Sequence, residues 1–344
     1  MTAFATLRRA GVLATALVAL ASGVLATGPA RAEAPEVHIS KGYGILYLPM
    51  IVMEHEKLLE KQAKAAGLGD VKVGWLELDG GNVINDAMIS GNLDIAAIGV
   101  PGFLTLWAKV KGNAKLEVSG LAGLSATSLY LNTNNPNIKS LKDFTAKDKI
   151  ALPGIKTSLS AVVLQMAVAK EFGDDNYAKL DPMTVGLPHP EAYTSLVSGK
   201  TEVNSHLGSP PYSFMELENP QVHRVMNSVD VLGNISLDLV YAPKRFIDAN
   251  PKLTAAFLAA LEEADRLIAD EPARAATIYV QSAKAKLSAE EVERMIKDPD
   301  TKFSTTPNGV MQFANFMGRV GTIKTRPATW QDLFIANVHS LPGS

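Results

Sequence analysis

Hydroxyl side chains crowd the start of one predicted helix. The stretch LPGIKTSLSAVVLQ places Thr157, Ser158 and Ser160 where a Pro-Gly turn gives way to an apolar run at helical spacing. Hydroxyls at this point can cap the free N–H groups of the first helical turn. The same N–H groups and the helix dipole also favour a bound anion. The stretch therefore predicts plain capping or an anion site, and we expect these three residues to contact a ligand.

Two histidines stand at the ends of predicted strands in the second half of the chain. His189 follows a proline, and His206 lies two residues before Gly208. Each is compatible with a structural role or with a ligand contact. The six histidines include no pair at metal-ligand spacing and the chain has no cysteine, so the sequence predicts no metal site. It also carries no nucleophile elbow, P-loop or zinc-protease motif, so we expect no catalytic residue and no cofactor.

One pattern of residues occurs twice. MISGNLDIAAIGVPGF and LVSGKTEVNSHLGSPPYSF each contain an apolar pair, Ser-Gly, one acid and then Gly-x-Pro. The matched positions are Ser90 with Ser198, Asp94 with Glu202, Gly99 with Gly208, and Pro101 with Pro210. We interpret the pair as the same junction in two sister domains, in which a helix, a Gly cap and a buried strand lead into a loop that faces a ligand.

The segments around each junction alternate between strand and helix patterns. Before the first junction, strands are expected over 36–43, 71–78 and 93–100, with helices over 48–69 and 79–90. Around the second, strands are expected over 149–154, 181–188 and 201–208, with helices over 157–173 and 189–199. A β-α-β-α-β order predicts parallel strands joined by helical crossovers.

Two extended, apolar segments join the predicted halves. They span 116–132 and 234–243, and two such crossovers between two lobes would form a hinge. The first lobe is expected to comprise 33–124 plus 238–344, and the second 125–237. Predicted helices at 250–270, 271–283, 288–298, 309–321 and 329–338 should pack on the first lobe.

The N-terminus has the pattern of a secretory signal peptide. Arg8 and Arg9 precede a charge-free run over 10–30, and Ala30-Arg31-Ala32 offers a small-x-small cleavage site. Residues 1–32 are therefore expected to be removed; an uncleaved membrane anchor is the alternative. Removal of these residues takes the net charge from −2 to −5, which disfavours nucleic acid as a partner.

The order of these features resembles the nitrate/sulfonate/taurine type of periplasmic substrate-binding protein, which serves ABC importers. The resemblance rests on the signal peptide, the two lobes, the SG-x-x-D-x-x-x-x-G-x-P junction and the tail NPKLTAAFLAALEEADRLIADEPARAATI, and it covers essentially the whole mature chain. Asn204-Ser205-His206 departs from the family, which usually carries apolar or aromatic residues there. The resemblance implies an α/β fold of the type II periplasmic-binding-protein kind, with two lobes, two hinge strands and a ligand cleft between them.

The carboxyl ends of the strands define the expected site, because ligands of open α/β sheets bind there. The predicted ligand contacts are Gly42, Tyr43, Gly80, Gly81, Asn82, Gly99, Val100, Pro101, Thr157, Ser158, Ser160, His189, His206 and Gly208. Tyr47, Phe103, Tyr212 and Phe214 are further aromatic candidates for the cleft wall, or else pack beneath the loops.

We therefore expect a monomeric periplasmic protein that captures a small, anionic sulfonate or carboxylate and delivers it to ABC permease subunits in the inner membrane. One alternative is a thiamine-pyrimidine-type precursor binder or synthase of the same fold. Another is a periplasmic sensor subunit, which presents its ligand to a membrane receptor.

Overall fold

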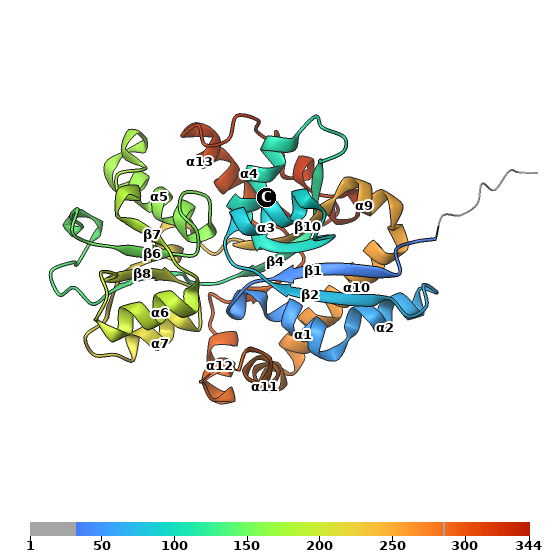
Figure 1. Ribbon diagram of the computed structural model, residues 1–344, viewed down its shortest axis with the longest axis horizontal. Coiled ribbons are helices and arrows are strands. Elements are labelled where there is room, and N and C mark those ends of the chain that lie inside the picture. The colour runs from blue at the N-terminus through green and yellow to red at the C-terminus, as the bar shows by residue number, and fades with distance from the viewer. Residues whose placement is uncertain (1–31, 285) are drawn as a thin grey trace, which may run out of the picture. The chain divides into compact units, whose positions relative to one another are not determined.

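The computed structural model describes residues 32–284 and 286–344, and the chain from Glu33 onward forms one unit (Figure 1). The predicted signal peptide, except for Ala32, lies outside the described residues. Within the described part of the chain, no helix has the length and apolar character needed to cross a membrane.

One six-stranded sheet, sheet A, forms the core of the first lobe, lobe I. Its strands are β1 (Glu36–Lys41), β2 (Lys72–Glu77), β3 (Ile95–Gly99), β4 (Val118–Ala126), β10 (Asp238–Pro243) and β11 (Lys302–Phe303). They lie in the order β11-β4-β10-β3-β1-β2. β1 runs parallel to β2 and to β3, whereas β10 is antiparallel to both of its neighbours. Every residue of β3, β4 and β10 is buried, which explains their uncharged or nearly uncharged sequences.

A five-stranded sheet, sheet B, forms the core of the second lobe, lobe II. Its strands are β5 (Tyr130–Thr133), β6 (Ile150–Leu152), β7 (Thr184–Gly186), β8 (Ser205–Gly208) and β9 (His223–Asn227), in the order β7-β6-β8-β5-β9. β6 is parallel to β7 and β8, and β5 is antiparallel to β8 and β9. This order repeats β2-β1-β3-β10-β4 of sheet A.

The doubled sequence pattern corresponds to a doubled structural unit. α3 (Gly81–Ser90) and α6 (His189–Ser198) end at Gly91 and Gly199, both in the left-handed conformation with φ of 80° and 62°. Each glycine leads into the third strand of its sheet, β3 or β8. A residue with a Cβ is strained at such a φ, so the glycine in each Ser-Gly pair is required by the turn.

The chain crosses between the two sheets twice, and these crossings form the hinge. β4 of sheet A continues into β5 of sheet B, and the chain returns to sheet A as β10. Asp238 at the start of β10 pairs with Gly99, and Tyr130 at the start of β5 pairs with Gly208, so these residues occupy equivalent positions in the two lobes. The predicted fold of two α/β lobes joined by two extended strands is confirmed; the lobe boundaries at 124/125 and 237/238 stay a prediction.

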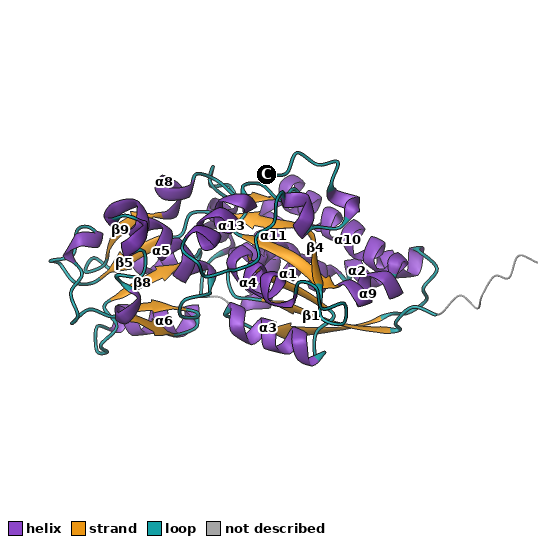
Figure 2. Cartoon of the chain, turned by 90° about the horizontal axis from the view of Figure 1, so that it is seen from above, coloured by secondary structure: helices purple, strands orange, loops and turns teal. Residues whose placement is uncertain are grey.

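Helices cover both faces of each sheet (Figures 1 and 2). Around sheet A, α3 and α4 lie on one side, and α1, α2 and α10 lie on the other; around sheet B, α5 faces one side, and α6 and α7 the other. The remaining helix bounds are α1 Leu48–Glu56, α2 Leu58–Ala65, α4 Val100–Val110, α5 Leu159–Phe172, α7 Tyr212–Leu217, α8 Ser228–Leu232, α9 Lys244–Ala249, α10 Pro251–Asp270, α11 Pro272–Ala283, α12 Ala289–Ile296 and α13 Val310–Arg319. As expected, tail helices pack on lobe I: α10 packs against α1 and α2, and α13 packs against α4.

Three predicted elements differ from the structure. The helix expected over 48–69 is broken at Lys57, whose φ of 54° ends α1 and starts α2. The segment 329–338 forms two short 3₁₀ turns rather than a helix. The prediction of a loop at Gly99-Val100-Pro101 is wrong, because β3 passes directly into α4. Pro101 lies in the first turn of α4, where a missing N–H is tolerated.

Candidate functional site

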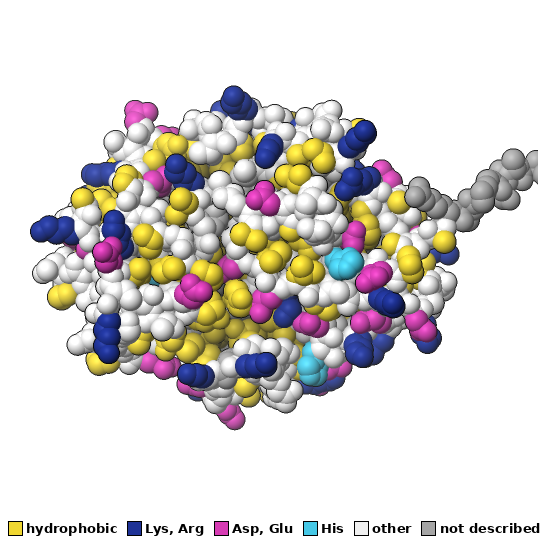
Figure 3. All heavy atoms as spheres, viewed as in Figure 1, with side chains coloured by type: hydrophobic (Ala, Val, Ile, Leu, Met, Phe, Trp, Pro, Cys, Tyr) yellow, Lys and Arg dark blue, Asp and Glu magenta, His cyan; other side chains and the backbone are white. Residues whose placement is uncertain are grey.

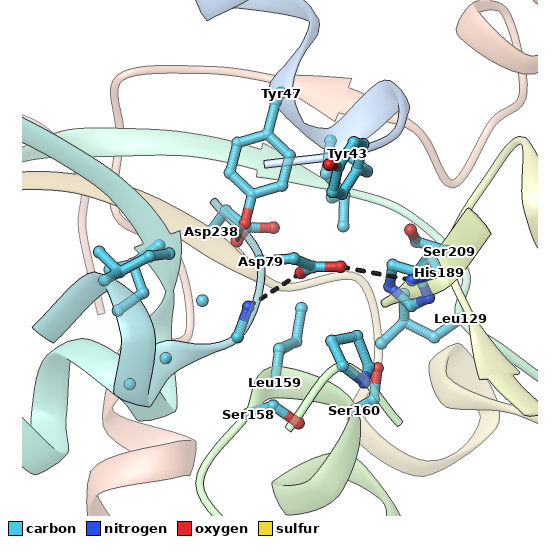
Figure 4. A pocket seen from close by; sticks show the side chains of 18 residues that line it. Tyr43, Tyr47, Asp79, Leu129, Ser158, Leu159, Ser160, His189, Ser209 and Asp238 are labelled. Atoms are coloured by element: carbon cyan, nitrogen blue, oxygen red, sulfur yellow. Dashed lines mark hydrogen bonds between the residues drawn. The ribbon is translucent and has the colours of Figure 1, made fainter. Parts of the chain in front are cut away.

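A pocket lies between the lobes, at the carboxyl ends of strands from both sheets (Figure 4). Seven predicted contacts line it: Tyr43, Gly80, Gly81, Gly99, Ser158, Ser160 and His189. Residues that were not among the predicted contacts also line it: Leu46, Tyr47, Asp79, Ile84, Ile98, Gly102, Leu129, Pro153, Leu159, Ser209 and Asp238. The cavity measures about 40 Å³, which holds a few water-sized groups.

Two carboxyl groups dominate the polar wall of the pocket. Asp79 follows β2, and its Oδ1 and Oδ2 atoms accept hydrogen bonds from the backbone N–H groups of Gly80 at 3.0 Å and His189 at 3.4 Å. Asp238 opens β10 and is 1% exposed; its Oδ1 accepts from the Tyr47 hydroxyl at 3.2 Å. Its Oδ2 atom is buried without a partner, and so is the Oγ atom of Ser209 from the other lobe.

Burial raises the pKa of both carboxyl groups. The pKa of Asp79 is raised to about 6, since desolvation outweighs the two backbone N–H groups that stabilise its charge. The pKa of Asp238 is raised to about 7 by burial and by the nearby Asp79, against the lowering effect of the Tyr47 hydrogen bond. Among the described residues that line the pocket there is no lysine and no arginine. The wall is therefore rich in acceptors and without a fixed positive charge.

His189 begins a buried hydrogen-bonded chain that leads away from the pocket. Its Nδ1 atom lies 2.8 Å from Nε2 of His206, and Nδ1 of His206 lies 2.5 Å from Oε1 of Glu216. Asn132 donates to the other oxygen of Glu216 at 2.8 Å. Burial, and then the neighbouring His206, lower the pKa of His189, so this ring is neutral near pH 7.

His206 does not line the pocket, contrary to the expectation from sequence. Its ring is fully buried behind His189 and contacts residues of α6 and α7. In a strand, side chains alternate between faces, and this register turns His206 toward those helices. Gly208 is also outside the lining; a Cβ there would lie 2.7 Å from Cε1 of His206, so this glycine makes room for the ring.

The Ser158 hydroxyl caps the start of α5. Oγ of Ser158 accepts from the Ala161 N–H at 3.2 Å and donates to the Gly154 carbonyl at 2.5 Å. The first-turn N–H groups of Leu159 and Ser160 have no intrahelical acceptor, as in any α-helix. Leu159 and Ser160 both line the pocket. The anion site expected at this end of the cleft stays a prediction.

Several predicted residues serve contacts between or within the lobes instead of lining the pocket. The Thr157 hydroxyl donates to Oδ1 of Asn82 at 2.9 Å, which links the two lobes at the surface. Val100 and Pro101 belong to the first turn of α4. A Cβ on Gly42 would lie 2.5 Å from Cε2 of Tyr47, so Gly42 leaves space for the ring that reaches Asp238.

Glycines also allow the lobes to approach closely. A Cβ on Gly99 would lie 2.8 Å from Cβ of Leu159, and one on Gly80 would lie 2.9 Å from the Pro153 carbonyl oxygen. Beside them, the Ile45 N–H donates to the Pro210 carbonyl at 2.9 Å. These contacts join lobe I to lobe II, so the structure holds the lobes in a closed arrangement.

Of the further aromatic candidates, Tyr47 lines the pocket. Tyr212 stacks on His189, with ring centroids 5.9 Å apart. Phe103 is a core residue that packs against Tyr241, with centroids 5.4 Å apart. Phe214 stacks on Tyr130 instead of lining the pocket.

Asp79 and Asp238 are not among the predicted ligand contacts, but the sequence contains features that could have indicated them. Asp79 stands directly between a strand and a Gly-Gly turn, and Asp238 is the one acid in the apolar stretch 234–243. An acid buried in a strand needs a reason, because an unpaired charge is costly there. In the described residues, no group of three or more His, Cys, Asp and Glu side chains is arranged to hold a metal ion.

The sequence pattern of the NMT1-like family matches residues 30–281, well over half of the chain. The chain belongs to the NMT1-like family. No curated protein sequence matches this NMT1-like chain.

Solved structures of binding proteins share the fold of this NMT1-like chain. The alkanesulfonate-binding protein SsuA of Xanthomonas axonopodis pv. citri, bound to MOPS, is 17% identical over 86% of this chain and 96% of its own, with a TM-score of 0.66. The aliphatic sulphonate-binding protein SsuA of Escherichia coli is 18% identical over 88% and 92%, with a TM-score of 0.63. The nitrate-binding protein NrtA of Synechocystis PCC 6803 is 15% identical over 88% and 84%, with a TM-score of 0.67. The predicted resemblance to this type of protein is confirmed at the level of the fold.

Proposed function

We propose that this NMT1-like protein is the solute-binding component of an ABC importer. It captures a small organic molecule in the periplasm and delivers it to permease subunits in the inner membrane, without chemistry on the solute. The observation that carries the proposal is the pocket between the lobes, where Asp238 Oδ2 and Ser209 Oγ are buried without partners. Buried polar atoms nearly always have partners, so a bound solute accounts for both.

Closure of the lobes supplies the mechanism. A solute that touches both walls gains its full set of contacts only in the closed state, so binding shifts the population toward closure. With lobe I as 33–124 plus 238–344 and lobe II as 125–237, the moving joints are the two connections between the sheets. The permease would then recognise the closed form.

The fold likeness to sulfonate- and nitrate-binding proteins supports an anionic sulfonate or carboxylate as the solute. The N–H groups at the start of α5 would hold its anionic group. A thiamine-pyrimidine-type precursor is the alternative, supported by the tyrosines and hydrogen-bond acceptors in the lining, Tyr43 and Tyr47 beside Asp79 and Asp238. A sensor subunit would use the same cleft and present the closed form to a receptor.

The surface supports a partner other than nucleic acid. Basic and acidic side chains are interspersed over the face drawn in Figure 3, and the whole chain has a net charge of −2. Nucleic-acid binding generally requires a clustered basic surface. We propose that the mature protein acts as a monomer.

A ligand screen tests the proposed function. The exported protein would be examined by thermal shift and calorimetry against sulfonates, nitrate, carboxylates, pyrimidines and amines. A solute at about 100 times its Kd should stabilise the fold by roughly 2.7 kcal/mol. Small-angle scattering with and without the hit should show compaction. Absence of binding in every class, together with unchanged solute uptake in a deletion strain, would contradict the proposal.

A further inference from the structure

We propose that the wall formed by Asp79 and Asp238 binds a positively charged, N–H-bearing group of the ligand, an ammonium or amidinium. This inference rests on the proposed function, because it names the chemistry of the solute that the same cleft would take. It concerns one end of the pocket, the end that Tyr43, Tyr47 and the two carboxyl groups share in Figure 4.

The first argument is the pair of unpartnered atoms. Asp238 Oδ2 comes from lobe I and Ser209 Oγ comes from lobe II, and both are buried in the pocket lining. An ionised carboxylate can only accept hydrogen bonds, so the group that satisfies Asp238 in its charged form must be a donor. Ammonium and amidinium groups carry several N–H donors and can reach more than one acceptor.

The second argument is charge. Asp79 and Asp238 line the pocket together, and the described lining residues include no lysine or arginine. His189 does not compensate, because burial lowers its pKa and keeps it neutral. Asp238 is buried and Asp79 is half-buried, and carboxylates removed from water need a cationic partner or a proton. The raised pKa values, about 6 for Asp79 and about 7 for Asp238, indicate that protons take this role when no cation is bound.

The third argument is the chemistry of the surrounding groups. Tyr43 and Tyr47 add aromatic rings to the lining, and such rings attract cations. An anion at this wall would instead face two carboxyl groups of like charge.

Isosteric probes separate the charge of the ligand from its shape. Benzamidinium, benzoate and benzenesulfonate share one ring, and acetamidinium and acetate share one planar end group. The exported protein would be titrated with each by calorimetry. We expect each amidinium probe to bind more tightly than its matched anion. Benzamidinium stays protonated between pH 6 and 8, so its affinity should rise over this range as the two carboxyl groups lose their protons.

Matched variants locate the interaction. Asp238→Asn keeps the shape of the side chain but removes its charge, and should weaken benzamidinium binding by about 10- to 100-fold. Asp265→Asn is the control: Asp265 lies in α10, outside the pocket lining, and also has a buried unpartnered oxygen and a pKa raised by burial. This control should leave the affinity unchanged. Circular dichroism would verify that both variants are folded.

The outcomes are distinguishable. Loss of amidinium binding in Asp238→Asn, but not in Asp265→Asn, supports the inference. Tighter binding of benzoate or benzenesulfonate than of benzamidinium, with affinities unchanged in Asp238→Asn, overturns the cation assignment and leaves solute capture standing. Failure of every probe of either charge to bind or to compact the protein overturns the inference and counts against the proposed function as well.

Discussion

Asp79 and His189 meet across the cleft, where Oδ2 of Asp79 accepts a hydrogen bond from the backbone N–H of His189 at 3.4 Å. Asp79 lies two residues after the last residue of β2 in lobe I, and His189 is the first residue of α6 in lobe II. The carboxylate therefore faces the positive end of a helix dipole that belongs to the other lobe. Closing the cleft therefore gives Asp79 a hydrogen bond that partly offsets the burial of its charge.

Gly99→Ala should hinder this closure. The new Cβ would lie 2.8 Å from Cβ of Leu159 in the other lobe, too close for two side-chain carbons. Solute affinity should fall by about tenfold because the closed state becomes overpacked. Gly186→Ala, at the end of β7 with nothing within 4 Å, is the matched control. Calorimetry with the best ligand of the screen measures both; equal affinities would show that the lobes do not close through Gly99.

The stability of the ligand-free protein should depend on the charge of Asp238. Its pKa is raised from 3.8 to about 7, so its contribution to the free energy of unfolding is present at low pH and lost as pH rises through about 7. The groups that face Asp238 are Tyr47 and Asp79, and the pKa of Asp79 is itself raised to about 6, mainly by burial. Asp238→Asn removes the titration, so its stability relative to the unmodified protein should increase from pH 5 to pH 8. The gain should be on the order of a few kcal/mol.

Urea unfolding at a series of pH values measures this difference. A constant offset between Asp238→Asn and the unmodified protein across the whole range would mean that Asp238 does not titrate in the folded state near neutral pH. Asp265→Asn provides a comparison, because the pKa of Asp265 is also raised, to about 8, but outside the cleft.

His206→Ala should damage folding more than ligand contact. The substitution leaves Glu216 fully buried with Asn132 as its remaining side-chain partner. Breaking such a buried pair costs about 3–5 kcal/mol of stability. His223→Ala, which loses a hydrogen bond to the Ile138 carbonyl in a half-buried position, should cost about 1 kcal/mol. Thermal unfolding of both variants tests this order, and a fully stable His206→Ala protein would contradict the structural role.

The protein should be exported and shortened. Expressed with its own N-terminus in a Gram-negative host, it should appear in the periplasm with Glu33 as its first residue. Intact-mass measurement of the periplasmic fraction identifies the cleavage site. Recovery of the full-length chain in the membrane fraction would instead indicate an uncleaved anchor.

The architecture could be predicted from local signals in the sequence. Gly91 and Gly199 end helices in the left-handed conformation, and apolar stretches follow them into buried strands. These signals act within a few residues, so pattern and structure agree on the order of elements. The sequence does not predict the start of α4, because Gly-x-Pro also occurs in turns, and only the structure shows that Pro101 lies in a first helical turn.

The pocket was harder to predict because its walls come from distant segments. Asp238 lies inside an apolar strand, and its contact with Tyr47 depends on how β10 inserts beside β3. His206 and Ser209 are three residues apart, yet one turns to the helices of lobe II and the other lines the pocket. Strand register decides this orientation, and register is set by partners that are remote in sequence.

The exchange of strands between the sheets also sets an order of assembly as the chain emerges from its N-terminus. All strands of sheet B lie in the continuous stretch from Tyr130 to Asn227, so lobe II can fold as soon as that stretch is available. Sheet A cannot be completed at that stage, because β10, the neighbour shared by β3 and β4, is synthesised only after lobe II. β11 follows later still. We expect the nascent or translocating chain to carry a completed lobe II beside an unfinished lobe I, whose exposed strand edges would be the segments that chaperones protect.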